Sequence, residues 1–137
     1  MMRILVAVND SPAGLAAARA AVRLARETGG SLRAVYVREL AGVAGRAAAE
    51  DFARQVPVPV LTYITDLAGQ AGVGVEALTI SGQPARCILD QAAAWPADLI
   101  VLGRSGVRHV GQPFVGSHLL HVLEFASVPI VVVPTQD

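Results

Sequence analysis

Short runs of apolar residues recur along the chain and alternate with segments of helical period. Each run is rich in Val, Ile or Leu and is bounded by Gly, Pro, Asn or Asp, which is typical of strands. Their apolarity is nearly continuous rather than alternating, which indicates strands that are covered on both faces. The pattern predicts five strands, at residues 4–8, 32–37, 75–80, 99–102 and 130–133.

The clearest helix is predicted over residues 12–28, where apolar side chains share one face and arginines share another. Ser11 suits the N-cap, Pro12 suits the first helical position, and Gly29 supplies a stop. We expect the arginine face to be solvated. The apolar face comprises Leu15, Ala18, Val22 and Ala25, and the basic face comprises Arg19, Arg23 and Arg26.

Three further helices are predicted between the strands. One covers residues 60–70, one runs from residue 84 until the Trp95-Pro96 pair ends it, and one covers residues 117–126. Prolines interrupt the segment before the first of these, so we expect 40–58 to be partly irregular or mobile. The inward faces are expected to carry Ile88, Leu89 and Ala92 in the second, and Leu119, Leu120, Leu123 and Ala126 in the last.

This alternation of strands and helices predicts an α/β fold with an open parallel sheet and helices on both faces. The length of 137 residues suits a single domain, 1–137. In open sheets of this kind, ligands bind beyond the carboxyl ends of the strands. Candidate functional residues are therefore expected in the loops that follow the strands.

Composition excludes several classes of partner. The chain has 11 basic and 11 acidic residues, so its net charge favours neither nucleic acid nor an anionic membrane. No apolar run approaches the roughly 20 residues that cross a bilayer, and the N-terminal residues do not resemble a signal peptide. The single cysteine, Cys87, cannot form an internal disulfide, and we expect it to be packed rather than reactive. A cytoplasmic location is expected.

The loop after the fourth predicted strand contains the clearest candidate chemistry. Gly103, Gly106 and Gly116 lie in or beside it, and Ser117 then opens a helix. Glycines let main-chain N–H groups approach an anion, and a helix N-terminus adds further donors. All 11 basic residues are arginine, so the lysine that a P-loop requires is not available. A dinucleotide fingerprint is also excluded, because the loop after the first predicted strand lacks the G-x-G-x-x-G pattern.

Order and spacing of these residues resemble the ATP-binding branch of the universal stress protein family. Gly103, Gly106 and Gly116-Ser117 reproduce its G-x2-G-x9-G-S pattern. Further segments are similar to the family, so that the resemblance spans nearly the whole chain, with residues 40–74 the least similar part. These segments are 4–12, 82–84, 97–103 and 128–134.

The resemblance implies a Rossmann-like fold, of the adenine nucleotide alpha-hydrolase-like kind, with strand order 3-2-1-4-5. It also implies binding of ATP, or of AMP or ADP, with Mg²⁺, and a homodimer formed through the last strand. Arg104 is a candidate phosphate contact for a separate reason, since it is a cation in the same loop. The residues that the resemblance assigns to ribose and phosphates are Gly103, Gly106, Gly116, Ser117 and His118. Those near adenine are Ala7, Val8, Asn9 and Val37, and Ser11 completes the first loop.

Asn9 departs from the family pattern, which usually has aspartate at this position. Asn9 could accept from a base amine through its carbonyl and donate through its NH₂ group. Turn formation by Asn9 and capping by Ser11 are alternatives that can coexist with binding. Asp10 could substitute for the missing carboxylate, although its position should point it elsewhere.

No catalytic residues and no dedicated metal site are expected, even though His118 and His121 have a spacing that allows two ligands. We therefore expect a nucleotide-dependent regulatory or stress-response module with little or no hydrolysis. One alternative is an interaction protein of the same fold that binds no nucleotide. Another is an enzyme that acts on an adenylated or phosphorylated small molecule.

Overall fold

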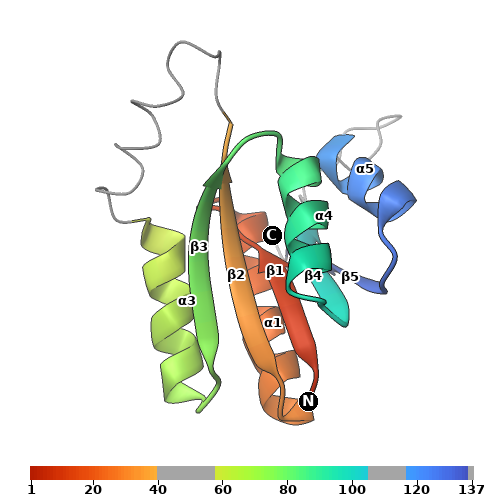
Figure 1. Cartoon of the computed structure of the whole chain (residues 1–137). Coiled ribbons are helices and arrows are strands. Elements are labelled where there is room, and N and C mark those ends of the chain that lie inside the picture. Colours follow the sequence, from red (N-terminus) through yellow and green to blue (C-terminus); the bar gives the residue numbers. More distant parts are fainter. Residues whose placement is uncertain (40–57, 105–116, 136–137) are drawn as a thin grey trace.

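The computed structural model describes residues 1–39, 58–104 and 117–135, and these contain five strands and four helices (Figure 1). Apart from Val58, the segment predicted to be irregular lies outside the described residues. The strands are β1 (Arg3–Ala7), β2 (Ser31–Arg38), β3 (Val75–Ser81), β4 (Leu99–Arg104) and β5 (Ile130–Pro134). The helices are α1 (Pro12–Thr28), α3 (Pro59–Gln70), α4 (Pro84–Ala94) and α5 (Ser117–Phe125).

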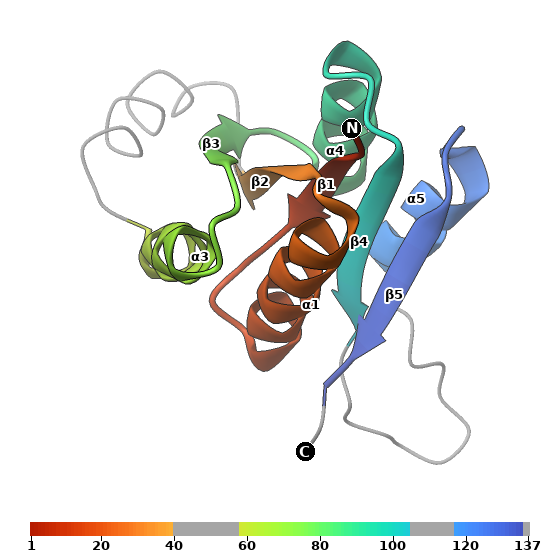
Figure 2. The same ribbon diagram turned by 90° about the horizontal axis from the view of Figure 1, so that it is seen from below.

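All five strands pair in parallel in one sheet with the order β3-β2-β1-β4-β5, which confirms the predicted topology. Seen from below, α1 and α3 cover one face of the sheet, and α4 and α5 cover the other (Figure 2). The connection from β1 therefore leaves toward one face and that from β4 toward the other. None of the described helices has the length and apolarity to cross a bilayer.

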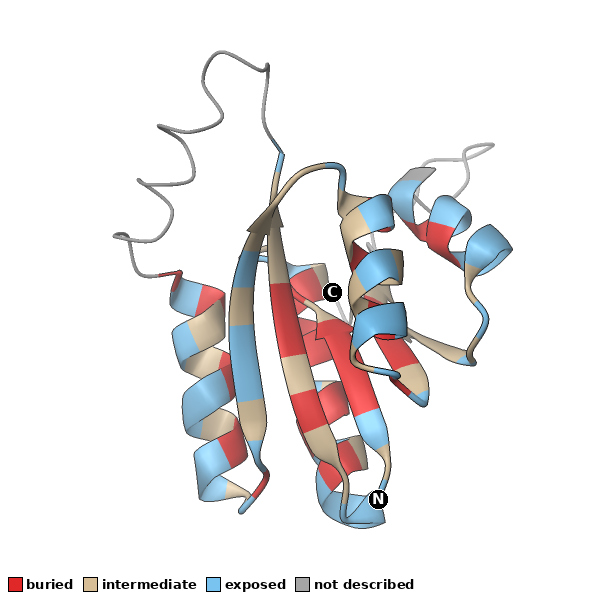
Figure 3. Cartoon of the chain, viewed as in Figure 1, coloured by how far each residue is buried: buried red, intermediate tan, exposed pale blue. Residues whose placement is uncertain are grey.

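Alternate residues of the central strands build two separate hydrophobic cores, visible as bands of buried positions in Figure 3. In β1, Ile4 and Val6 belong to the core under α1 and α3, whereas Leu5 belongs to the core under α4 and α5. All three side chains are fully buried. A strand points successive side chains to opposite faces, so a strand covered on both faces needs apolar residues at every position.

Helix α1 begins and ends where the sequence predicts. The hydroxyl of Ser11 accepts a hydrogen bond from the N–H of Gly14 at 3.2 Å, and Gly29 ends the helix with a left-handed φ of 68°. Strand bounds differ by one or two residues from the prediction. For example, β1 ends at Ala7, and the N–H of Val8 still donates to the carbonyl of Val35 at 3.0 Å.

The predicted inward face of α5 is wrong in part. Leu119 and Val122 are buried, whereas Leu120 and Leu123 are 52% and 43% exposed. Apolar residues occur on every side of this short helix, so its sequence does not define a single face. The packing against α4 and the sheet selects the stripe formed by Leu119 and Val122.

Helix α3 receives its N-terminal cap from a distant loop. Its N-cap residue, Val58, has no side-chain hydrogen bond to offer. Instead, the Asp10 Oδ1 atom accepts a hydrogen bond from the N–H of Val60 at 2.9 Å. The loop after β1 therefore starts α1 through Ser11 and caps α3 through Asp10.

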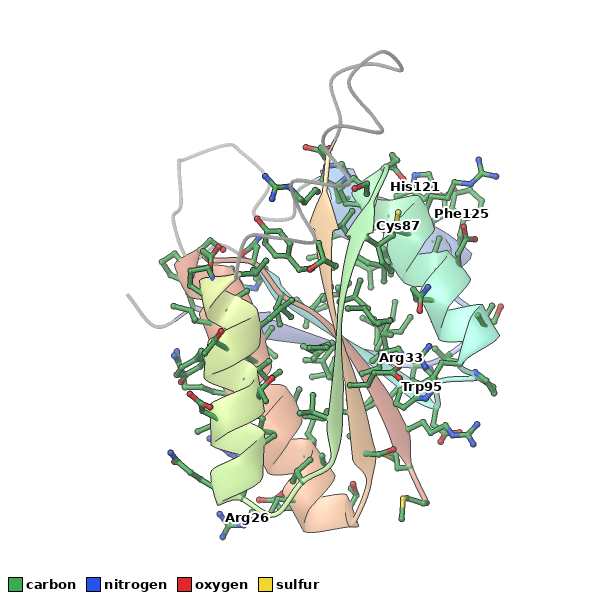
Figure 4. All side chains as sticks on the ribbon, turned by 60° about the vertical axis from the view of Figure 1, so that its left-hand side comes forward. Arg26, Arg33, Cys87, Trp95, His121 and Phe125 are labelled. Atoms are coloured by element: carbon green, nitrogen blue, oxygen red, sulfur yellow. The ribbon has the colours of Figure 1, made fainter. Side chains whose placement is uncertain are left out.

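At the C-terminal end of α4, Arg33 of β2 joins the helix to the sheet. Its guanidinium lies 5.0 Å from the ring centroid of Trp95. Both side chains are labelled in Figure 4. It also donates to the Gln91 side chain at 3.2 Å and pairs with Glu76 of β3 at 2.5 Å. This cluster fixes the C-terminal end of α4 against β2 and β3.

Two glycines let the ends of β1 and β4 approach the first turn of α1. A Cβ atom at Gly103 would lie 2.1 Å from the carbonyl oxygen of Ala13. One at Gly14 would lie 2.2 Å from the carbonyl oxygen of Asn9. Both neighbours are main-chain atoms, so neither can move aside without shifting a helix or a strand.

Replacing Asp10 tests the cap of α3. We expect Asp10→Ala to lower the free energy of unfolding by about 1 kcal/mol, because the N–H of Val60 loses its acceptor. Asp10→Asn keeps an oxygen in place and should retain most of the stability. Urea denaturation of both variants measures the difference. Equal losses in the two variants would contradict the capping role.

Replacing Gly103 tests the close contact between β4 and α1. We expect Gly103→Ala to destabilise the protein by about 3 kcal/mol, because the added methyl group meets the main chain of Ala13. Gly69→Ala is the matched control, since a Cβ there meets nothing within 4 Å and lies in a helix. It should be neutral or stabilise by up to about 1 kcal/mol. Thermal melting that ranks the two variants in the opposite order would refute the assignment.

Candidate functional site

A cavity of about 470 Å³ opens at the carboxyl ends of β1, β2 and β4, beside the first turns of α1, α4 and α5. Its position is the point where the connections from β1 and β4 diverge toward opposite faces of the sheet. Open parallel sheets bind ligands at such points. The volume is in the range of small-molecule sites.

The inner wall of the cavity is apolar. It consists of core residues from β2, β4, α4 and α5, each no more than 7% exposed. A wall of this kind suits a flat aromatic ring, which gains by leaving water. These residues are Val35, Ile88, Leu102, Leu119 and Val122.

Ionisable groups border the opening of the cavity. His118 in the first turn of α5 and Glu39 after β2 both line it, and their Nε2 and Oε1 atoms lie 3.4 Å apart. The two side chains are 49% and 66% exposed, so this pair contributes little to stability. Both groups are therefore accessible to a ligand that enters the cavity.

On the β1 side of the cavity, Asn9 forms a tight turn with Ser11. The Asn9 Oδ1 atom accepts from the N–H of Ser11 at 3.0 Å and also from the Ser11 hydroxyl. That hydroxyl in turn accepts from Gly14 at the start of α1. Turn formation by Asn9 and capping by Ser11 thus occur together, and Asn9 still lines the cavity.

The cavity brings together many of the sequence-predicted site residues from three strands and a helix. Ser11 supports Asn9 without lining the cavity, and Arg104 ends β4 outside the lining. Gly106 and Gly116 lie outside the described residues. Ser117 begins α5, and its side chain also falls outside the described part. Those that line the cavity are Ala7, Val8, Asn9, Val37, Gly103 and His118.

Sequence reasoning missed most of the apolar wall and the charged groups after β2. The rule that ligands bind beyond the carboxyl ends of parallel strands also applies to β2, and it could have indicated Arg38 and Glu39. The i, i+3 spacing of Leu119 and Val122 was a usable signal for the wall. Ile88, from the start of α4, had no signal that distinguishes it from an ordinary core residue.

Two other candidate groups do not belong to the cavity lining. Asp10 is engaged with α3, as its position in the loop suggested. Cys87 lies in α4, with its sulfur 3.9 Å from the carbonyl oxygen of Ser81. Burial raises the pKa of the Cys87 thiol, and the Asp90 carboxylate raises it further, while Arg86 opposes them. The thiolate is therefore disfavoured, which agrees with a packed rather than a reactive cysteine.

The chain is similar to curated relatives in sequence and to solved structures in fold. The universal stress protein MJ0531 of Methanocaldococcus jannaschii is 26% identical over 137 residues, which cover 96% of this chain and 81% of that protein. The universal stress protein of Archaeoglobus fulgidus is 26% identical, with a TM-score of 0.76 over 97% of this chain and 98% of that one.

A structure of the universal stress protein from Archaeoglobus fulgidus in complex with dAMP is also similar. It is 26% identical, with a TM-score of 0.69 over 97% of this chain and 98% of that one. The sequence model of the universal stress protein family matches residues 1–134. Because this match extends over nearly all of its 137 residues, the chain belongs to the universal stress protein family.

Proposed function

We propose that this chain is a single-domain, ATP-binding universal stress protein that acts in the cytoplasm as a nucleotide-dependent regulatory module of the stress response. The observation that carries the proposal is the cavity, which joins an apolar wall to the glycine at the end of β4 and to the first turn of α5. ATP is the proposed ligand, with AMP or ADP as alternatives. The relative from Archaeoglobus fulgidus solved with dAMP supports an adenine nucleotide.

In this proposal the base lies against the apolar wall near Val37, and the phosphates extend toward the start of α5. Gly103 and the N–H groups at the N-terminus of α5 lie on that side of the cavity. A helix N-terminus favours anions through its unpaired donors and its dipole. The phosphate contacts of Gly106, Gly116 and Ser117 are part of the proposal and rest on the sequence motif.

Mg²⁺ accompanies the nucleotide in this proposal and is held by phosphate oxygens and water. Among the described residues, no three His, Cys, Asp or Glu side chains gather where they could hold a metal ion. Mg²⁺ often keeps several waters and binds through substrate phosphates rather than through a protein cage. The residues that are present fit a metal that enters with the nucleotide.

Slow or absent hydrolysis is proposed because the sequence contains no recognisable acid/base arrangement. In addition, Asp10, the carboxylate next to Asn9, is engaged in capping α3. A group that activates water must reach the attacked phosphate. Binding that changes association with a partner is thus the proposed mode of action.

One observation favours the alternative, an interaction protein that binds no nucleotide. The side-chain oxygen of Asn9, Oδ1, is fully engaged by Ser11, so the side chain at the position that carries aspartate in the family offers a ligand no acceptor. The glycine-rich loop after β4 also contains Gln112-Pro113, an unusual pair within the motif, and these two residues lie outside the described ones. Ligand binding therefore has to be measured directly.

A homodimer through β5 is also proposed. This strand is an edge of the described sheet, and its apolar residues are only partly buried. Leu123 and Phe125 of the preceding helix are 43% and 60% exposed. An apolar edge strand beside exposed apolar side chains suits pairing with a second copy of the chain.

Nucleotide binding is tested by denaturing the purified protein and analysing released adenine nucleotide, then by melting with and without Mg-ATP. Ligand at ~100 times its Kd should stabilise the protein by about 2.7 kcal/mol. Val37→Trp should abolish the effect because the ring fills the cavity. Thr79→Trp on the exposed edge strand β3 is the matched control and should bind normally. Absence of both nucleotide and stabilisation in the wild type would favour the alternative.

The proposed dimer is tested by Val132→Pro. The carbonyl of Pro129 bonds to the N–H of Ile100 in β4, so by alternation the N–H of Val132 faces away from β4. Proline there should leave the sheet intact while it removes an outward donor. Light scattering should report a dimer for the wild type and a monomer for the variant. A monomeric wild type, or a variant that stays dimeric, would rule out this interface.

A further inference from the structure

The side-chain carbonyl of Asn9 has no capacity left for a ligand. A carbonyl oxygen accepts through two lone pairs. Oδ1 of Asn9 already accepts two hydrogen bonds, one from the N–H of Ser11 and one from the hydroxyl of Ser11. The hydroxyl is itself held in place, because it accepts from the N–H of Gly14.

The orientation of the Asn9 amide follows from this turn. A main-chain N–H can only donate, so the atom that faces the N–H of Ser11 must be the oxygen. The Nδ2 group is thus turned away from that donor, and it has no partner among the described residues. Because Asn9 lines the cavity, Nδ2 is the side-chain group it can offer to a ligand.

We propose that Asn9 selects its nucleotide by donating a hydrogen bond to an acceptor on the purine edge. This inference rests on the proposed function. It adds that, in one contact, the protein donates the hydrogen bond and the ligand accepts it. An aspartate in the same turn could bond to Ser11 through one oxygen and would present the other oxygen as an acceptor. Asn9 keeps the turn and exchanges that free acceptor for a donor.

Two consequences follow for the ligand. A 6-amino group placed against Asn9 meets a second donor, whereas a 6-oxo group or a ring nitrogen there meets a partner. An amide NH₂ group also has no lone pair for a cation, so Asn9 gives Mg²⁺ no direct contact. The ligand class is therefore a purine nucleotide bound through an acceptor, either a ring nitrogen or the 6-oxo oxygen.

The matched variant is Asn9→Asp, which has the same shape and keeps the two bonds to Ser11. The added negative charge weakens the binding of all nucleotides that carry the same phosphate by the same factor. This factor cancels when the Kd values of two ligands are compared as a ratio within one protein. The probes are AMP, IMP, 1-deaza-AMP, 3-deaza-AMP and 7-deaza-AMP, with Kd measured by calorimetry. Thermal melting without ligand confirms that the variant is folded.

We expect one of two results, and both support the proposal. Either one deaza analogue binds the wild type about three- to tenfold more weakly than AMP, or IMP binds it more tightly than AMP by a similar factor. In both cases Asn9→Asp should abolish or reverse the ratio. The first result identifies a ring nitrogen as the acceptor, and the second identifies the 6-oxo group.

Affinity ratios that are the same in wild type and Asn9→Asp would overturn the inference about Asn9. Because nucleotide would still bind in that case, the proposed function would stand. Failure of every probe to bind the wild type would instead reject the proposed function, and the inference with it. The two failures are therefore distinguishable in a single set of titrations.

Discussion

Three consecutive side chains after β1 fix both helices of one face of the sheet and one side of the cavity. Ser11 caps α1, Asp10 caps α3, and Asn9 folds back onto Ser11 while it lines the cavity. Each bond satisfies a polar group that the fold would otherwise leave without a partner. The helices α1 and α3 and the candidate site therefore depend on one short loop.

The sheet gives this loop a rigid base. Helices cover both faces of β1, so its residues contribute to both cores. The strand is also paired with β2 on one side and with β4 on the other. Gly14 and Gly103 then allow the loop and the end of β4 to lie directly against α1. Larger residues at these positions would separate the elements that form the cavity, so the shape of the cavity depends on close packing of the main chain.

The fold could be predicted from the sequence because its signals are local and repeated. Continuous apolar runs mark strands that are covered on both faces, and Ser11 and Gly29 mark the two ends of α1. The inward face of α5 could not be predicted, since its apolar residues surround the helix. The bond from Val60 to Asp10 joins residues 50 positions apart, and no local pattern encodes such a contact.

The same limit applies to the site. Strand ends and glycine spacing indicated the β1 and β4 sides of the cavity, but the apolar wall comes from residues that look like ordinary core. On the β1 side, the side chains of Asn9 and Ser11 are held by hydrogen bonds to each other and to the start of α1, so a ligand need not order them. Under the proposed function, a ligand-dependent signal would then arise elsewhere. The pair of His118 and Glu39 is exposed and contributes little to stability, and its two residues belong to α5 and to the segment just after β2. Under that proposal these elements, rather than the loop after β1, are where a bound nucleotide would change the surface.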